Sequence, residues 1–407
     1  MLSQNVDPRF IYLGSKPVTQ RVKLKNYIHK DVNIGKDGRM DAGELEIKAG
    51  ISQNTVDQLI AHLMMDPTFG DNMEGYSQFT VSSWEGTSWS TRGTVTAFSP
   101  FDARADAEAL RKAMKGMGTD EETILKILTS RNNTQRQEIA SAFKTLFGRD
   151  LVDDLKSELT GKFETLMVSL MRPRYIFDAH ALKHAIKGAG TNEKVLTEIL
   201  ASRTPEEMRN IKQVYLQEYE ANLEDKIKGE TSGHFQRLLV VLLQANRDPD
   251  GRVDEGLVEQ DAQVLFRAGE LKWGTDEEKF ITILGTRSVS HLRRVFDKYM
   301  TISGFQIEET IDRETSGDLE KLLLAVVKCI RSVPAYFAET LYYSMKGAGT
   351  DDDTLIRVMV SRSEIDLLDI RQEFRKNFAK SLYHTIQKDT SGDYRKALLL
   401  LCGGEDD

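Results

Sequence analysis

Lys115-Gly-Met-Gly-Thr119 is the stretch that decides how this chain of 407 residues is organised, because its final Gly-Thr pair returns three more times. Each Thr is followed by an Arg 12 residues later, by an acid 39 residues later and by a Gly three residues past that acid. The Gly-Thr pairs are Gly118-Thr119, Gly190-Thr191, Gly274-Thr275 and Gly349-Thr350. The arginines are Arg131, Arg203, Arg287 and Arg362, the acids are Glu158, Glu230, Glu314 and Asp389, and the later glycines are Gly161, Gly233, Gly317 and Gly392. Four matches at three offsets define four repeats of about seventy residues each.

The repeats carry the hydrophobic pattern of short helices. Ile124, Ile127 and Leu128 fall on one face at helical spacing, and Leu166 to Met171 is apolar enough for a more deeply buried helix. Proline is scarce, with 8 residues in the whole chain. We therefore expect an all-α protein with about five short helices in each repeat.

The Gly-Thr pair is expected to lie in a loop just before a helix. Thr119 followed by Glu122 has the residues of a capping box; the third loop repeats this arrangement, whereas Lys194 leaves it incomplete in the second. The glycines allow backbone carbonyls to turn toward one point. A capping turn alone explains a single copy, but it does not need a carboxylate at a fixed remote position.

A calcium ion needs both the loop and the remote acid. Calcium takes 6–8 oxygen ligands, and three loop carbonyls with one bidentate carboxylate supply about five of them. The remaining positions go to water or to a ligand, and a single carboxylate leaves net positive charge that favours an anionic oxygen such as that of a phosphate. Magnesium fits less well because it prefers a small octahedral shell and keeps its waters. The pattern therefore predicts four similar calcium sites, able to bridge a chain of net charge −8 to an anionic membrane.

The third loop differs from the others. Ala268-Gly-Glu-Leu-Lys-Trp-Gly-Thr275 is one residue longer than the first loop, and Lys272 and Trp273 replace a Gly-containing pair. A Trp in a polar loop is more often packed down than exposed. If calcium reshapes the loop, however, Trp273 reaches the lipid interface, where its amphipathic ring is favoured. Trp273 is therefore the candidate membrane contact.

The composition limits the class of protein. With 29% charged and 40% hydrophobic residues the chain is typical of soluble globular proteins, and its net charge of −8 argues against a general nucleic-acid binder. No apolar run approaches the roughly 20 residues of a spanning helix, and the N-terminus has no apolar secretion signal. Seven histidines are scattered and no nucleophile–base pair stands out, so we do not expect an enzyme. Two cysteines without metal spacing fit a cytoplasmic protein.

Three of the loops resemble the type II calcium sites of the annexin family. They are Lys115-Gly-Met-Gly-Thr119, Lys187-Gly-Ala-Gly-Thr191 and Lys346-Gly-Ala-Gly-Thr350, each with its remote acid. The resemblance extends from about Arg92 to Asp407. It implies four five-helix repeats in a curved disc, calcium loops on the convex face, and reversible binding to phosphatidylserine membranes as calcium rises. The metal ligands that it implies are the carbonyls of Met114, Gly116, Gly118, Ile186, Gly188, Gly190, Gly269, Lys272, Gly274, Met345, Gly347 and Gly349 and the carboxylates of Glu158, Glu230, Glu314 and Asp389.

The resemblance carries further expectations about function. It implies no catalytic residues, shielding of lipid from phospholipases and clotting factors, self-association on the membrane, and an extracellular pool reached without a signal peptide. The family also has a proposed hydrophilic central pore, and Asp178, Arg203, Arg357 and Asp366 occupy matching places, while Ala181 stands where some members have an acid. These charges either conduct ions or form buried pairs that fix the packing of two halves, and we prefer the second interpretation. Ion conduction, or a helical scaffold whose loops merely cap helices, are the alternatives to membrane binding.

The N-terminal segment does not join the repeats. Asn33 to Glu44 fits a 12-residue EF-hand loop with Gly38 at its sharp turn, but Gly35 offers no side-chain oxygen where one is wanted. A second loop near residues 72–79 lacks the final acid. The segment is either a small helical, degenerate EF-hand pair, with a helix near residues 55–65, or a stretch without order of its own; its partner is unknown.

The sequence thus predicts seven successive parts, with a turn-rich connector as the seam between two halves. They are an N-terminal extension (1–79), a Ser/Thr-rich linker (80–93), repeats at 94–170 and 171–245, the connector (246–255), and repeats at 256–332 and 333–407.

Overall fold

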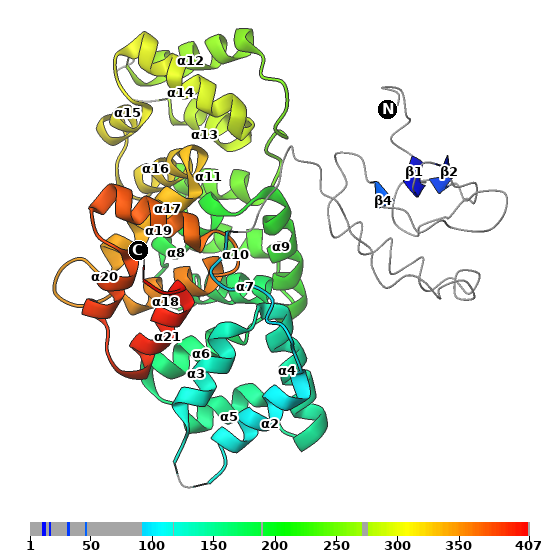
Figure 1. Ribbon diagram of the computed structural model, residues 1–407. Helices are drawn as coiled ribbons and strands as arrows, with labels where there is room; N and C mark the ends of the chain where they lie inside the picture. The colour runs from blue at the N-terminus through cyan, green and yellow to red at the C-terminus, as the bar shows by residue number, and fades with distance from the viewer. Residues whose placement is uncertain are drawn as a thin grey trace. The chain divides into compact units, whose positions relative to one another are not determined.

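The chain forms two compact units, divided after Ser90. The computed structural model describes residues 92–116, 118–188, 190–270 and 276–405, together with four short strands before residue 92 (Figure 1). In the first unit, β1 (Phe10–Leu13) pairs antiparallel with β2 (Lys16–Pro17) and β4 (Leu45–Glu46) and parallel with β3 (Asp31–Val32). The predicted EF-hand loop, its possible partner and the predicted helix near residues 55–65 lie outside the described residues.

The second unit is built from four groups of five helices, as the all-α prediction requires. The first group is α2 (Ala103–Ala113), α3 (Glu121–Ser130), α4 (Asn133–Phe147), α5 (Leu151–Glu158) and α6 (Gly161–Leu170). The second is α7 (Arg174–Ala185), α8 (Glu193–Ser202), α9 (Pro205–Tyr219), α10 (Leu223–Glu230) and α11 (Gly233–Leu243). The third is α12 (Glu255–Gly269), α13 (Glu277–Thr286), α14 (Val289–Ser303), α15 (Ile307–Glu314) and α16 (Gly317–Arg331). The fourth is α17 (Val333–Ser344), α18 (Asp352–Arg362), α19 (Leu367–Phe378), α20 (Leu382–Asp389) and α21 (Gly392–Cys402).

The repeated Gly that follows each acid marks a helix start. It is the first residue of α6, α11, α16 and α21, and its φ lies between 61° and 70° in all four copies. A side chain is disfavoured in that left-handed conformation, so the backbone angle, and not a lack of space, requires Gly here. The sharp turn lets the last helix of each repeat begin after only two intervening residues.

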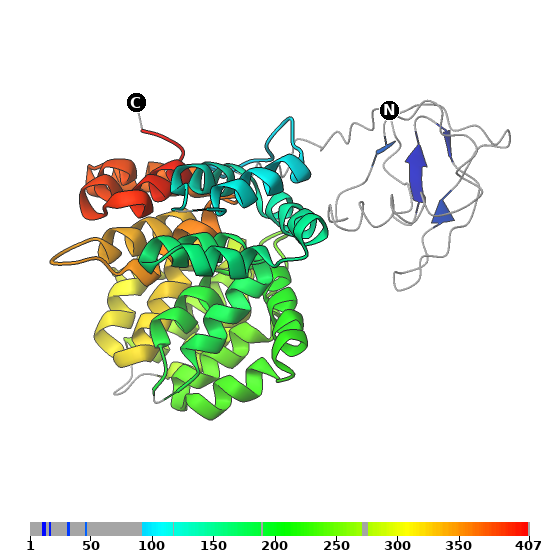
Figure 2. The same ribbon diagram turned by 90° about the horizontal axis from the view of Figure 1, so that it is seen from below.

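The four repeats share two hydrophobic cores rather than one. Repeats 1 and 4 contribute to the first core, which includes Leu110, Leu128 and Phe374, and repeats 2 and 3 contribute to the second, which includes Leu196 and Phe296. The two views show the same arrangement, with the cyan first repeat beside the red fourth one and the green second repeat beside the yellow third one (Figures 1 and 2). Each fully buried Leu or Phe side chain contributes about 1.5–3 kcal/mol relative to an exposed one.

This pairing corrects the predicted position of the seam. The connector at 246–255 joins α11 to α12, and both helices contribute residues to the same core. The boundary between the two cores therefore lies between repeats 1 and 2 and between repeats 3 and 4. A turn-rich stretch shows where helices stop, but it does not show which helices pack together.

The end of the predicted Ser/Thr-rich linker is docked onto repeat 4. The Arg92 carbonyl accepts a hydrogen bond from Leu368 N (2.8 Å), and Val95 N donates to the Ser363 carbonyl (3.0 Å). A Cβ added to Gly93 would lie 2.5 Å from the Glu364 backbone, so the close approach requires Gly. Residues 92–95 therefore belong to the helical unit and tie its first repeat to its last.

The repeated Arg, 12 residues past each Thr, has a structural partner. In repeats 1 to 3 it makes a two-pronged pair with an Asp of the repeat's first helix, and in repeat 2 the Arg203 Nε–Asp178 Oδ2 distance is 2.8 Å. In repeat 4 Phe337 stands 25 residues before Arg362, where an Asp would be expected, and Arg362 instead pairs with Asp366 at 2.7–2.8 Å. The pairs are Arg131–Asp106, Arg203–Asp178, Arg287–Asp261 and Arg362–Asp366.

One buried ion pair joins the two cores. Arg357 of α18 donates two hydrogen bonds, of 2.8 and 2.7 Å, to the carboxylate of Glu198 on α8. Both side chains are at least nine-tenths buried. Removing one partner of such a pair leaves an uncompensated buried charge, which typically costs about 3–5 kcal/mol. All four charges predicted at the centre, those of Asp178, Arg203, Arg357 and Asp366, are thus engaged in ion pairs.

Candidate calcium sites

Each candidate loop is closed by one backbone hydrogen bond across its base. In repeat 1, Asp120 N donates to the carbonyl of Ala113, the last residue of α2, with an N–O distance of 2.9 Å. The same bond recurs in repeats 2, 3 and 4, where it joins Asn192 to Ala185, Asp276 to Ala268, and Asp351 to Ser344. In repeats 1, 2 and 4 the described residues between these partners form a short projecting loop.

The loop glycines hold conformations that other residues rarely adopt. Gly116 and Gly118 have φ values of 122° and 96°, and the corresponding glycines of repeats 2 and 4 lie between 97° and 116°. Nothing lies within 4 Å of a Cβ added at any of these positions. The loops therefore stand in open space, and Gly is required by the backbone angles. These loops contain the predicted carbonyl ligands Gly116, Gly118, Gly188, Gly190, Gly347 and Gly349.

The residue that caps the next helix is not the one predicted. Asp120, one residue after Thr119, is the N-cap of α3, and its carboxylate accepts from Thr123 N (3.0 Å) and Thr123 Oγ1 (2.7 Å). These hydrogen bonds lower the pKa of Asp120 below its ordinary value. Asn192 and Asp351 cap α8 and α18 in the same way. The capping-box prediction for Thr119 is therefore wrong, because an aspartate next to it satisfies the helix end.

The Thr hydroxyl instead binds the remote acid. Thr119 Oγ1 donates to Glu158 Oε2 at 2.9 Å, across the 39 residues that separate them in sequence. Thr350 Oγ1 donates to the carboxylate of Asp389 and, at 3.2 Å, to its carbonyl. In repeat 2, Thr191 Oγ1 reaches only the Glu230 carbonyl, at 3.0 Å. The repeated spacing thus places the acid beside the glycine loop.

Repeat 3 holds its acids differently. The Arg313 guanidinium donates to Glu314, with an Nε–Oε1 distance of 3.1 Å, and also to Glu270, the residue that follows α12. Glu270 accepts a further bond from Thr310 Oγ1 at 2.7 Å. A guanidinium therefore neutralises the acid that the repeat pattern assigns to calcium. Lys272, Trp273 and Gly274 of this loop lie outside the described residues, and so does Thr275.

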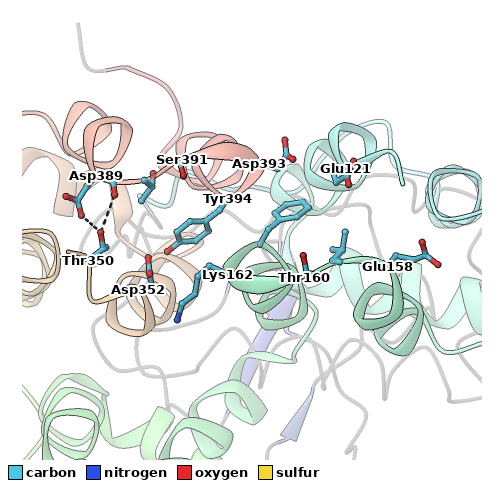
Figure 3. A pocket seen from close by; sticks show the side chains of 13 residues that line it. Glu121, Glu158, Thr160, Lys162, Thr350, Asp352, Asp389, Ser391, Asp393 and Tyr394 are labelled. Carbon is cyan, nitrogen blue, oxygen red and sulfur yellow. Dashed lines mark hydrogen bonds between the residues drawn. The ribbon is translucent and has the colours of Figure 1, made fainter. Parts of the chain in front are cut away.

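A hollow joins the acid of repeat 1 to the acid of repeat 4. It measures about 460 Å³, and its lining includes Glu158 and Asp389 (Figure 3). Figure 3 also shows the Thr350–Asp389 hydrogen bonds at one end and Glu158 at the other. Three more carboxylates line it, those of Glu121, Asp352 and Asp393, against the single cation of Lys162. The hollow therefore carries excess negative charge, as a face that attracts cations would.

The remaining predicted ligands lie at the ends of helices. Met114, Ile186 and Met345 are buried and directly follow α2, α7 and α17, while Gly269 is the last residue of α12. A Cβ on Gly269 would lie 2.8 Å from Thr310 Cγ2, so this glycine serves close packing. Sequence reasoning missed the roles of the Thr hydroxyl and of Arg313. The recurrence of Thr beside every loop was a signal for the first, whereas only the fold brings Arg313 to Glu270.

Four five-helix repeats, with a glycine loop beside a remote carboxylate in repeats 1 and 4, define a class of helical-repeat protein. The sequence profile of the annexin family, described as "Annexin", matches residues 105–170, 177–242, 260–326 and 336–401. The chain belongs to the annexin family, whose members bind phospholipid membranes in a calcium-dependent manner.

Individual relatives agree with this assignment. The chain is 95% identical to annexin A5 of Gallus gallus over 317 residues, which is 78% of this chain and 99% of that protein. A solved structure of chicken annexin V in complex with Zn²⁺ matches with a TM-score of 0.75 at 95% identity, covering 77% of this chain and 99% of that one. The crystal structure of calcium-bound annexin (Sm)1 matches at 36% identity with a TM-score of 0.69, covering 78% of this chain and 94% of that one.

Proposed function

We propose that this protein binds anionic phospholipid membranes reversibly, through calcium ions held between its glycine loops and their remote acids. The observation that carries this proposal is the Thr119–Glu158 hydrogen bond, because it sets a carboxylate beside a loop whose backbone projects into open space. In the absence of metal the Thr hydroxyl holds the acid in place. Binding of a calcium ion to this carboxylate then requires little rearrangement of the loop or of the acid.

The ligand set follows from the loop. In repeat 1 we assign the carbonyls of Met114, Gly116 and Gly118 and the carboxylate of Glu158. The same positions in the other repeats are Ile186, Gly188, Gly190 and Glu230; Gly269, Lys272, Gly274 and Glu314; and Met345, Gly347, Gly349 and Asp389. Three carbonyls and one bidentate carboxylate leave one to three positions of calcium's usual 6–8 for water or a lipid phosphate oxygen.

Electrostatics explains why calcium is needed. The protein carries a net charge of −8, so it and an anionic membrane repel each other. A dication held by a single carboxylate keeps net positive charge and attracts phosphate and carboxylate oxygens of phosphatidylserine. Several such loops on one body act together, since each bound loop raises the effective concentration of the others at the surface. Trp273 is the proposed apolar contact with the membrane.

We infer that the charged residues at the centre hold the two cores together rather than conduct ions. Each of the predicted pore charges has an ion-pair partner, and Arg357 forms an ion pair with Glu198 across the boundary between the two cores. Among the described residues, no helix is both long and apolar enough to cross a membrane. Peripheral binding from the cytoplasm, shielding of lipid from phospholipases and clotting factors, and self-association on the membrane are further parts of the proposal, as is an extracellular pool.

The proposal is tested by sedimentation with phosphatidylserine vesicles, with phosphatidylcholine vesicles as the comparison. We expect binding with calcium, release by a chelator, and loss of binding in the variant Glu158→Gln/Glu230→Gln/Glu314→Gln/Asp389→Asn. The control variant Glu108→Gln/Glu138→Gln/Glu206→Gln/Glu218→Gln neutralises the same number of exposed carboxylates on α2, α4 and α9 and should bind normally. Equal binding by both variants would contradict the assigned sites, and binding that ignores calcium would contradict the bridge.

A further inference from the structure

Two histidines of α7 face each other one helical turn apart. The Nε2 atoms of His180 and His184 lie 3.0 Å apart, and their ring centroids are 4.2 Å apart. His184 is exposed and His180 is half-buried, so the pair lies at the surface of the helix bundle. This geometry singles out one position for an imidazole-bound ion.

The separation of the two nitrogens matches a chelate. Imidazole nitrogens bind zinc at about 2.0–2.1 Å, so two of them on one ion lie about 2.9 Å apart at a right angle and about 3.3 Å apart at a tetrahedral angle. The observed 3.0 Å falls within this interval. We propose that His180 and His184 form a two-histidine site for a divalent transition-metal ion, separate from the calcium loops.

The surroundings select the kind of ion. Lys156 and Arg172 act on His180 as positive charges, and no group of three or more His, Cys, Asp or Glu among the described residues is arranged to hold a metal. Hard cations such as calcium, which need several oxygen ligands, have little to bind here. Zinc, nickel and copper bind imidazole strongly even without a carboxylate, in the order that places copper first. The remaining coordination positions are left to water or to a donor from another molecule.

The contact between the two rings has two explanations, a shared metal ion and a hydrogen bond within the pair. A simple His–His hydrogen bond also explains the 3.0 Å contact, but it would give no affinity for metal. Metal binding therefore separates the two explanations.

The test uses the full chain in saturating calcium, so that the calcium loops are filled, and titrates Cu²⁺ and Zn²⁺ by calorimetry. We expect His184→Ala to weaken binding at least about tenfold, since even loss of an outer-shell partner of a metal ligand costs that much. His180→Ala/His184→Ala should remove one equivalent of ion. The control His234→Ala/His384→Ala changes two histidines on α11 and α20 and should keep it.

Copper supplies a second readout. The electron paramagnetic resonance spectrum of the Cu²⁺ complex should show two nitrogen donors, which fall to one in His184→Ala. Circular dichroism checks folding, and because His184 is exposed this single variant should fold normally. Unchanged stoichiometry and affinity in the double variant, or a copper signal without nitrogen splitting from this pair, would overturn the proposal.

Discussion

Repeats 1 and 3 share the same spacing of Thr and acid but hold the acid by different partners. In repeat 1, Glu158 accepts a single hydroxyl bond from Thr119 beside an open loop. In repeat 3, Arg313 donates to both Glu270 and Glu314. A hydroxyl leaves the carboxylate with its full charge, whereas a guanidinium neutralises it. The same sequence pattern therefore leaves the Glu158 carboxylate available to a cation, whereas the Glu314 carboxylate is already paired with Arg313.

The comparison predicts that the acids are unequal in function. Glu158→Gln should raise the calcium concentration for half-maximal vesicle binding on the order of tenfold, equivalent to about 1.4 kcal/mol. Glu314→Gln should raise it less, because calcium must first displace Arg313 there and gains less from the acid. Vesicle sedimentation over a calcium series measures both. A larger effect of Glu314→Gln would reverse the ranking of the two repeats.

The Thr hydroxyl should contribute through positioning. Thr119→Val keeps the shape of the side chain but removes the donor to Glu158. We expect calcium affinity to fall about two- to tenfold, the range that corresponds to one hydrogen bond of roughly 0.5–1.5 kcal/mol. Thr145→Val is the control, since Thr145 donates only within its own helix. Identical calcium midpoints for the two variants would show that Thr119 does not hold the acid in place.

Removing the guanidinium should make repeat 3 more like repeat 1. Arg313→Met should lower the calcium needed by repeat 3 by up to about fivefold, because partly exposed ion pairs are weak. Trp273 fluorescence reports on this loop in a Trp84→Phe/Trp89→Phe background, which leaves it as the only tryptophan. Arg294→Met, which breaks the Arg294–Glu255 pair, serves as the control. A midpoint that rises in Arg313→Met would mean that the arginine supports the site.

The smallest expected effect concerns repeat 4, whose loop is anchored to repeat 2. Burial raises the pKa of Asp351, but Lys194 and Thr354 lower it more, to about 2. A carboxyl group with a lowered pKa stabilises the fold above its unfolded pKa near 4, and this contribution is lost as pH falls from about 4 to 2. After allowance for solvent screening it is under about 1 kcal/mol.

Acid unfolding of Asp351→Asn measures that contribution. The variant should be slightly less stable at neutral pH and should lose less stability between pH 4 and 2 than the parent chain. Lys194→Met should reproduce part of the change, because it removes the cation that faces Asp351. An unfolding curve of Asp351→Asn that runs parallel to the parent curve over this window would contradict the assignment.

Much of the fold could be predicted because its signals are local. Ile124 and Leu128 are fully buried, as their helical spacing requires, and the repeated Gly at the start of α6 follows from one backbone angle. The cap of α3 was misplaced by one residue because Thr119 and Asp120 both suit the position. The hydrogen bond from Thr119 to Glu158 decides between the two residues, because it turns the Thr119 hydroxyl to the remote acid and leaves Asp120 to cap α3.

The sequence by itself determined the four repeats, their helices and the candidate acids, because the same residues return at the same distances. In repeats 1, 2 and 4 the distance from Thr to acid reflects a contact within one repeat. The tertiary structure decided which repeats contact each other and through which residues. It paired repeat 1 with repeat 4, joined Arg357 to Glu198 and docked residues 92–95 on the last repeat. It also set Arg313 against Glu270. Such contacts depend on which surfaces meet after the helices have formed, and no spacing along one chain records that choice.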